Sequence, residues 1–532
     1  MIEAGFQEIV ITPPIGTTAL AGYGGLKTFA RGLNDDLLAN CCVIKSNDDI
    51  VALVSIDVMG MLPETVARIR TLAHQLTNGT IPEENMLIAC THTHSGPDLM
   101  GIFYPGENLK SHVDTTYVDV FIRLVAGAIL GAFNDLQPVS VKASRTTVSG
   151  LAGNRREAAQ LPPNPVAPRT IDPEVEIVSF SSGDKIRGII VNFAAHATSF
   201  PTTKAMAISA DYIGAMRREL KKHLGDITCL YLNGACGDVN PDASRLIGTI
   251  PRLRIDLDVG ERRAHIPGFS EFSSKAGLEP GMFASFYEEK IKKAQLSGFH
   301  EVECEIVLDD DGSLNLHFPD QMPKAEKFKN MLSWFFSSDL DDLAYIRCGT
   351  RLARAVLASL ETSTSIDDSA AIVCLSKPVR VDIDDPDMAN EGLFEEYMRN
   401  DDGGKYYAEV EVQVMKIGEI IIVTMPGEPV NQVQLRIKAI IRQQTSYEHV
   451  LFSEITNGEI GYILTPEEYD MMGYESIICF GRENAYILER ALIELVSTEI
   501  GIGLEWTPSI ALPDNTSFIG VKITDIIDVE MS

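Results

Sequence analysis

Ala89-Cys90-Thr91-His92-Thr93-His94-Ser95-Gly96-Pro97 is the stretch on which the predicted fold depends. The apolar residues Met86 to Ala89 predict a buried strand, and Ser95-Gly96-Pro97 must take the chain out of the sheet. In an α/β protein, the loops beyond the carboxyl ends of the strands line the crevice in which ligands bind. Two imidazoles there indicate a metal or catalytic site, and a hydrogen-bonded histidine pair in a tight turn is the alternative. If the chain is extended, both rings lie on one face, so one can bind a metal while the other contacts substrate.

The composition argues against several classes of partner. A chain of 532 residues can bury a large core, and its formal net charge of −30 repels nucleic acid and anionic membranes. Met1 to Phe6 lack the features of a signal peptide, and we see no apolar run of about 18 residues that would allow stable membrane insertion. Nine cysteines without a Cys-X-X-Cys pair predict buried thiols and a cytoplasmic protein. Self-association into a homo-oligomer stays open.

The alternation of apolar and amphipathic segments predicts an α/β fold with mixed sheets and packed helices. We predict a βαβ unit formed by a strand over Ile50–Ile56, a helix after Pro63 and a strand over Met86–Ala89. No repeat is apparent in the sequence. The Gly-rich loop Ala21 to Gly25 allows the backbone to approach another group closely. Further helices are expected over 116–135, 429–443 and 483–499, and further strands over 174–180, 186–193, 229–232, 370–381, 408–417, 419–424 and 450–455.

Candidate ligands recur after other predicted strands. His196 follows the strand that ends at Phe193, and Glu428 follows the strand 419–424. Tyr462 lies in a loop that enters a short helix through Thr465-Pro466, a favourable N-cap and N1 pair. Taken alone, Glu428 is also expected as a helix cap and Tyr462 as a core tyrosine, and Asp57 and Asp211 are expected to cap strand or helix ends. Recurrence at equivalent positions favours one shared site on the strand-end loops.

Seven motifs in this order resemble the neutral ceramidase family, zinc amidases that cleave the N-acyl bond of ceramide. Thr91 to Pro97 match the family's most recognisable motif letter for letter. The similarity covers most of residues 5–500 and implies a catalytic domain over 1–505, followed by a short segment, 506–532, in place of a separate β-sandwich domain. The other motifs are Asn154-Arg155 with Asn164-Pro165, Phe193 to His196, Ser209-Ala210-Asp211, Gly237-Asp238-Val239, Pro426-Gly427-Glu428, and Tyr462 to Glu475.

The resemblance also implies roles for single residues. Four residues would bind a zinc ion: His92, His196, Glu428 and Tyr462. Two histidines, a carboxylate and an open position suit a hydrolytic zinc site in general, and zinc lowers the pKa of its water to about 7. His94, Arg155 and Tyr474 correspond to residues that face the substrate amide. His94 would pass a proton to the leaving amine, and Arg155 or Tyr474 would hold the oxyanion.

One position departs from the family pattern. The family's loop reads Gly-Asp-Val-Ser-Pro, and this chain has Asn240 where that serine stands. An amide side chain cannot form an acyl-enzyme, so we expect the zinc-bound water to attack the substrate directly. Asn240 would then donate to an oxyanion or contact a polar group of the substrate.

We therefore expect a zinc-dependent hydrolase that cleaves a linear N-acyl amide bond. Because this sequence shows neither the family's C-terminal domain nor a secretion signal, the expected substrate is a soluble N-acyl amine or related small molecule rather than membrane ceramide. An esterase or lactonase on the same site, or an inactive metal-stabilised binding homologue, are the alternatives. The retained His94, Arg155 and Tyr474 favour the hydrolase, because a scaffold does not need substrate-facing side chains. Residues 245–345 are interpreted as an insertion or lid that lays aromatic side chains over an acyl group.

Overall fold

The computed structural model describes most of the chain, and the architecture below refers to the residues that it describes. These are residues 1–16, 19–22, 29–101, 113–158, 171–241, 253–258, 263–266, 305–309, 313–317, 344–367, 371–384, 398–401, 403–471, 473–510, 512 and 527–531.

Three of the sheets are built in the same way. Each has three antiparallel strands, a helix that crosses to a fourth strand parallel to the third, and a second helix. The first unit contains β1 (Ile2–Val10), β3 (Leu38–Ser46), β4 (Asp49–Ile56), α1 (Pro63–Leu76), β5 (Met86–Cys90) and α2 (Thr115–Asn134). The second contains β7 (Ser140–Thr147), β9 (Glu174–Ser182), β10 (Lys185–Phe193), α5 (Asp211–Leu224), β12 (Thr228–Asn233) and α10 (Ala344–Leu360). The third contains β19 (Ile372–Ile383), β21 (Tyr406–Ile417), β22 (Ile420–Thr424), α12 (Asn431–Gln444), β24 (His449–Ser453) and α15 (Asn484–Ile500).

Shorter elements complete the sheets and connect the units. β6 (Gln137–Pro138), β18 (Thr364–Ser365) and β20 (Met398–Asn400) add to β1, β7 and β21. Three two-stranded pairs join loops: β2 (Gly32–Leu33) with β11 (Ala207–Ile208), β8 (Ala152–Asn154) with β13 (Val239–Pro241), and β23 (Glu428–Pro429) with β25 (Tyr462–Ile463). The short helices are η1 (Glu83–Asn85), α3 (Arg155–Ala158), α4 (Thr202–Ala205), α13 (Pro466–Asp470) and α14 (Tyr474–Ile477).

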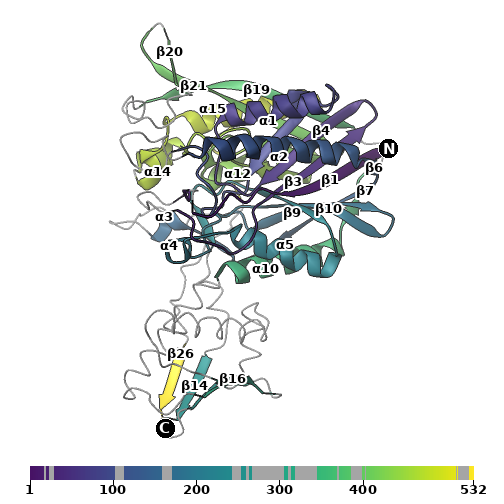
Figure 1. The fold of residues 1–532 in the computed structure, drawn as a ribbon. Coiled ribbons are helices and arrows are strands. Elements are labelled where there is room, and N and C mark those ends of the chain that lie inside the picture. The colour runs from purple at the N-terminus through teal and green to yellow at the C-terminus, as the bar shows by residue number, and fades with distance from the viewer. Residues whose placement is uncertain are drawn as a thin grey trace.

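The three sheets face one common core. Its residues come from the inner faces of all three units, for example Leu53, Ile190 and Ile422. The outer face of each sheet packs against the two helices of its own unit in a second core. Figure 1 shows this arrangement, with α1, α2 and α15 on one side of the body and α5 and α10 on the other. Strands buried on both faces explain why β5, β12, β22 and β24 read as nearly continuous apolar runs.

The predicted α/β class, the first βαβ unit and the expected helices are confirmed. The expectation that the chain has no repeat is wrong for the structure, because the order of strands and helices recurs three times. The recurrence lies in the order and pairing of the strands and helices. A comparison of sequence letters therefore does not reveal it.

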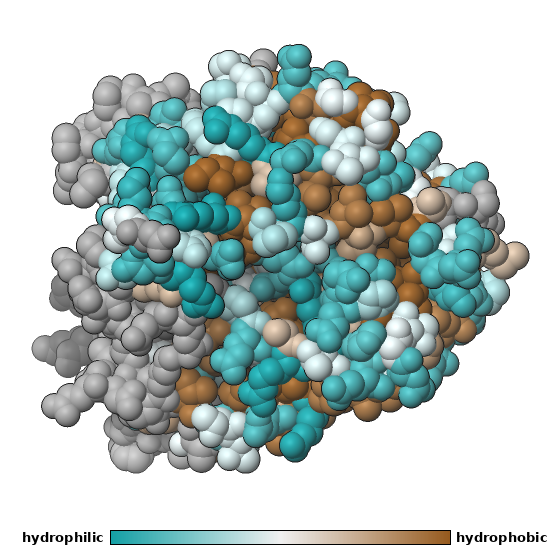
Figure 2. Space-filling view, turned by 90° about the horizontal axis from the view of Figure 1, so that it is seen from above, coloured by the Kyte–Doolittle hydropathy of each residue, from teal (hydrophilic) through white to brown (hydrophobic). Residues whose placement is uncertain are grey.

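α2 is the described helix that is long and apolar enough to cross a membrane, with a mean hydropathy of 1.6. Asp119 and Arg123 interrupt the apolar residues of α2, so this helix does not overturn the expectation of no uninterrupted apolar run of about 18 residues. Half of that window is buried, and Phe121, Val125 and Ile129 belong to the outer core of the first unit. The face of the molecule seen in Figure 2 carries hydrophilic residues among the hydrophobic ones.

Eight cysteines are described, seven of them buried, and none of these eight lies in a disulfide. The neighbours Cys41 and Cys42 point to opposite faces of β3, one into the outer core and one into the common core. Buried thiols are expected in the apolar runs at Cys229, Cys374 and Cys479. The structure buries Cys229 and Cys479 but leaves Cys374 only partly buried, so the expectation is wrong for Cys374.

The predicted lid falls mostly outside the described residues. This holds for Phe269, Phe272, Phe283, Phe286 and Tyr287, so the lid stays a prediction. Four described strands of the segment form a sheet with the last described strand, β26 (Ile527–Met531), which pairs in parallel with β14 (Leu253–Asp258). Figure 1 shows this sheet apart from the three units. Its other strands are β15 (Arg263–Ile266), β16 (Glu305–Leu308) and β17 (Leu314–His317).

Candidate metal centre

The three units bring their parallel strand ends to one place. His92 follows β5, His196 follows β10 and Glu428 follows β22. Tyr462 comes from the loop after β24, and β25 pairs with β23 so that Tyr462 lies opposite Glu428. All four side chains are buried. The four ligands implied by the resemblance, spread over more than 300 residues of sequence, therefore come from strand-end loops of all three units. His196 and Glu428 follow the third strand of their units, and His92 and Tyr462 follow the fourth.

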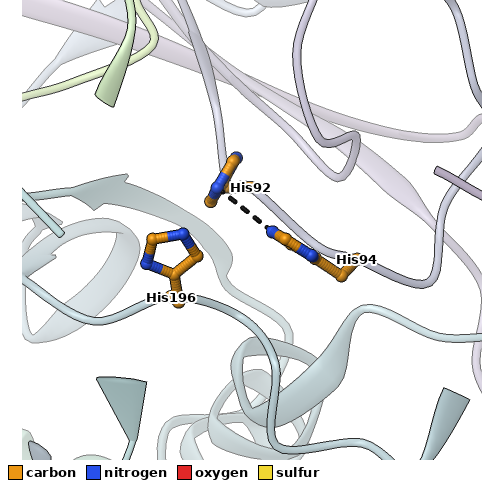
Figure 3. A group of neighbouring side chains, drawn as sticks. All are labelled: His92, His94 and His196. Carbon is orange, nitrogen blue, oxygen red and sulfur yellow. Dashed lines mark hydrogen bonds between the residues drawn. The ribbon is translucent and has the colours of Figure 1, made fainter. Parts of the chain in front are cut away.

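The ligand atoms lie within contact distance of one another. Nε2 of His92 lies 3.2 Å from Nε2 of His94 and 3.3 Å from Oε2 of Glu428. Nε2 of His196 lies 3.1 Å from the same carboxylate oxygen. The ligand atoms of the three histidines are within 4.8 Å of one another (Figure 3).

Backbone carbonyls set the orientation of each imidazole. Nδ1 of His92 lies 2.9 Å from the carbonyl oxygen of Met59, and Nδ1 of His196 lies 2.6 Å from that of Cys236. Nδ1 of His94 lies 2.9 Å from the carbonyl oxygen of Gly22. A carbonyl only accepts, so each Nδ1 carries a proton, and each Nε2 faces inward and offers a lone pair there once it is deprotonated. This is the usual outer support of metal-binding histidines.

These distances fit a shared metal ion. Zinc bonds of about 2.0–2.2 Å place tetrahedral ligand atoms about 3.3–3.6 Å apart. The observed separations of 3.1–3.3 Å are close to this spacing. The geometry accommodates His94 as a ligand as well as His92, His196 and Glu428. The assignment of His94 to proton transfer and of Tyr462 to the metal therefore stays a prediction.

The electrostatics of the centre also suit a cation. Burial favours the neutral acid, but His92 and His196 outweigh it and hold the pKa of Glu428 well below its usual range. Burial lowers the pKa of His92, yet the Glu428 carboxylate more than offsets this and raises it to about 9. Burial and then the charge of Arg155 lower the pKa of His196 to about 4. Burial and the two neighbouring histidines keep the pKa of His94 well below its usual range. A divalent ion would take the place of the proton shared by His92 and Glu428.

His92 itself corrects one expectation. Its φ is +65°, a left-handed backbone, so the chain is not extended from His92 to His94. The two rings meet edge to face instead of lying side by side along a strand. A turn therefore aims both imidazoles at the same point.

Glu428 is not a helix cap. α12 begins at Asn431, its N-cap residue Val430 makes no side-chain cap bond, and the Glu428 carboxylate contacts the two histidines instead. The helix-cap alternative is therefore wrong, whereas the predicted cap at Thr465 is confirmed by its bond from the Glu468 amide.

Arg155 lies at the edge of the centre. Its Nη2 donates to the hydroxyl of Tyr462 at 3.1 Å and to the carbonyl of Gly237 at 2.7 Å, and its Nη1 donates to Oδ1 of Asn240 at 3.4 Å. The structure thus brings Arg155, Asn240 and Tyr462 together beside the histidines. Tyr474 begins α14, and its side chain lies outside the described part of the chain, so its position toward substrate stays a prediction.

Two buried acids that the sequence reasoning missed lie next to the centre. Glu454 accepts bonds from the amide and the thiol of Cys236, and burial raises its pKa to about 8. Glu459 accepts from the amide of Gly461, and burial together with the charge of Glu428 raises its pKa well above the usual value. Glu454 follows the buried strand β24 directly, and Glu459 lies in the same loop. An acid in a strand-end loop is the signal that could have found them.

Close backbone approaches hold the loops in place. Gly22 has φ +99°, and a Cβ there would lie 2.4 Å from Nδ1 of His94, so the Gly-rich loop approaches this histidine as predicted. A Cβ on Gly237 would lie 2.5 Å from the carbonyl oxygen of Glu428. These approaches leave no room for a side chain at either position.

Two other acids have structural roles, although Asp211 is the first residue of α5 and not its predicted cap, since the N-cap is Ala210. Asp57 accepts from the Leu38 amide and the Thr91 hydroxyl. The Asp211 carboxylate accepts from three backbone amides around the start of α5. Both carboxylates therefore hold loop backbone in place.

The comparisons with known proteins agree with this geometry. The family model "Neutral/alkaline non-lysosomal ceramidase, N-terminal" matches residues 3–241 and 405–488, which is more than half of the chain. A neutral ceramidase of Mycobacterium tuberculosis (strain ATCC 25618 / H37Rv) is 23% identical over 528 residues, covering 93% of this chain and 76% of the relative. One of Oryza sativa subsp. japonica is 26% identical over 40% of this chain and 28% of the relative.

Solved structures show the same fold. Neutral ceramidase from Pseudomonas aeruginosa matches with a TM-score of 0.63 at 15% identity, covering 96% of this chain and 76% of the other. A ceramidase complexed with C2 matches with a TM-score of 0.62 at 14% identity, covering 98% of this chain and 78% of the other. The two matched ranges of the family model contain all four candidate ligands, His92 and His196 in the first and Glu428 and Tyr462 in the second. The chain belongs to the neutral/alkaline non-lysosomal ceramidase family.

Proposed function

We propose that the protein is a zinc-dependent hydrolase that cleaves an N-acyl amide bond. One observation carries the proposal: inward-facing Nε2 atoms of His92 and His196 meet the carboxylate of Glu428 at the spacing of ligands on one ion. Family membership supports the reaction class. We propose Tyr462 as the fourth ligand, because it lies opposite Glu428 in the β23–β25 pair.

A bound zinc ion would supply a nucleophilic water at neutral pH and polarise the substrate carbonyl. Side chains of the protein would transfer the proton and stabilise the oxyanion. His94, held by the Gly22 carbonyl, lies beside the ligands and would carry the proton from the attacking water to the leaving nitrogen. Arg155 would stabilise the developing oxyanion together with Tyr474, and Asn240 would contact a polar group of the substrate.

We propose a soluble N-acyl amine or related small molecule as the substrate. The net charge of −30 supports this choice over ceramide in an anionic membrane, since such a surface repels the protein. We also propose a cytoplasmic location, which the buried thiols support. Fractionation of cells that express a tagged chain tests the location.

A substrate panel on metal-analysed protein tests the function. The panel contains N-acyl amines of graded acyl length, the matching esters, lactones and ceramide in detergent. Zinc-dependent release of amine from the soluble amides is the expected result. Faster cleavage of esters or lactones than of amides would show that the protein is an esterase or lactonase. Bound zinc with no turnover of any substrate class would indicate a metal-stabilised binding protein.

A further inference from the structure

Glu475 joins two neighbouring arginines at the edge of the metal centre. Its Oε1 accepts from Nε of Arg155 at 2.9 Å, and its Oε2 lies 3.4 Å from Nη1 of Arg156. The Glu475 and Arg156 side chains are almost fully buried, at 6% and 5% exposure, while Arg155 is 23% exposed. A buried carboxylate shared by two guanidinium groups is held much more firmly than a surface ion pair.

The hydrogen bonds of Arg155 show what Glu475 does for it. Glu475 holds the Nε edge, and the Gly237 carbonyl and the Tyr462 hydroxyl hold Nη2. Toward the described residues, Nη1 makes only the long bond of 3.4 Å to Asn240. The protein therefore holds the Nε and Nη2 groups of Arg155 in place. Nη1 is the group best placed to contact a substrate.

The same carboxylate fixes a second part of the site. Glu475 lies in the first turn of α14, directly after Tyr474. Arg156 in turn binds Glu468 in α13, through the carbonyl at 3.0 Å and the carboxylate at 3.2 Å. The Arg155-Arg156 pair thus ties α3 to both helices of the segment that carries Tyr474.

We propose that Glu475 is a positioning residue that orients Arg155 and anchors the start of α14. The inference rests on the proposed function for the role of Arg155 toward substrate, whereas the anchoring does not. Glu475→Gln keeps the size of the side chain but removes the charge that both arginines share. A displaced guanidinium stabilises the oxyanion poorly, so turnover should fall roughly tenfold or more, while the zinc content stays unchanged.

Asp470→Asn is the matched control. Asp470 lies five residues earlier on the same segment and pairs with Arg482 at 2.6 Å, but this pair is exposed at 56% and 41%. Removing its charge should change turnover less than about twofold, because exposed pairs contribute little. Glu475→Asp keeps the charge on a shorter side chain and should restore part of the turnover lost in Glu475→Gln.

A double-mutant cycle separates positioning from general destabilisation. If Glu475 acts through Arg155, Glu475→Gln should have little further effect on kcat in the Arg155→Ala background. An equal loss in both backgrounds would overturn the role toward Arg155.

Hydrogen exchange tests the anchoring without any substrate. Peptides that contain 153–158 and 473–478 should exchange faster in Glu475→Gln than in wild type or Asp470→Asn. Unchanged exchange would overturn the anchoring. If no substrate is found, the proposed function fails while hydrogen exchange still decides whether Glu475 anchors the segment.

Discussion

Two clusters of buried ionisable side chains, the α12–β9 ion network and the metal centre, differ in how their charges are balanced. In the α12–β9 ion network, the carboxylates Asp172, Glu174 and Glu176 face Lys438 and Arg442. Lys438 bonds two of these acids at 2.9 Å each. In the metal centre, His92, His196 and Glu428 instead face each other across 3.1–3.3 Å.

The difference distinguishes the candidate metal centre from a purely structural cluster of charges. In the α12–β9 ion network each acid pairs with a base of the chain, and Glu176 also lies 2.9 Å from Nδ1 of His449, so the network needs no ligand and serves stability. The metal centre gathers lone pairs and a carboxylate, an arrangement that a cation from outside the chain would stabilise. Changes in the first cluster should therefore alter stability alone, and changes in the second should alter metal content and turnover.

The largest effect is expected from loss of a ligand. His196→Ala should abolish zinc binding and activity together, because losing one ligand weakens metal binding steeply. Metal analysis and amide turnover measure this. His223→Ala, an exposed histidine on α5, is the matched control and should keep both. Full zinc occupancy in His196→Ala would remove His196 from the ligand set.

The next largest effect concerns proton transfer. His94→Ala should keep zinc and lose roughly 100-fold or more in turnover, the usual scale for a general acid. Parallel measurement of zinc and kcat checks it. Loss of zinc in this variant would instead make His94 the fourth ligand, which its 3.2 Å separation from His92 also fits.

A smaller effect is expected at the position where the family has a serine. Asn240→Ser should keep zinc and change kcat by less than about tenfold, because attack by water needs no acyl-enzyme. Rapid-quench kinetics check this prediction. A burst of product in Asn240→Ser would show that a serine there reacts covalently.

The smallest effect on turnover is expected in the α12–β9 ion network. Burial favours neutral Glu174, but Lys438 and Arg442 outweigh this and lower its pKa. Glu174→Gln should cost roughly 3 kcal/mol of stability at pH 7, with zinc and kcat unchanged. Wild type gains this stability above the unfolded carboxyl pKa of about 4.3 and loses it as pH falls through the lower folded pKa. Urea unfolding should therefore show the gap between the two proteins shrinking as the pH falls below this value, and a gap independent of pH would contradict the assignment.

Sequence reasoning reached the strands and the ligands because each ligand follows an apolar run. His92, His196, Glu428 and the Tyr462 loop could be found as candidates in this way, whereas the choice of Glu428 over a helix cap and of Tyr462 over a core tyrosine needed the family motifs. The threefold recurrence of the units could not be found, since it depends on strand order. Glu454, Glu459 and Glu475 were missed because their burial is a property of the folded chain, although the strand-end position of Glu454 and Glu459 was a usable signal.

Anomalous diffraction at the zinc absorption edge, from crystals of the full chain, would locate the ion directly. We expect one strong peak within about 2.0–2.2 Å of His92 Nε2, His196 Nε2 and a Glu428 oxygen, with the Tyr462 hydroxyl as the fourth protein ligand. A peak at another place in the molecule, or zinc-loaded crystals with no peak between these side chains, would contradict the assignment of this cluster as the metal centre.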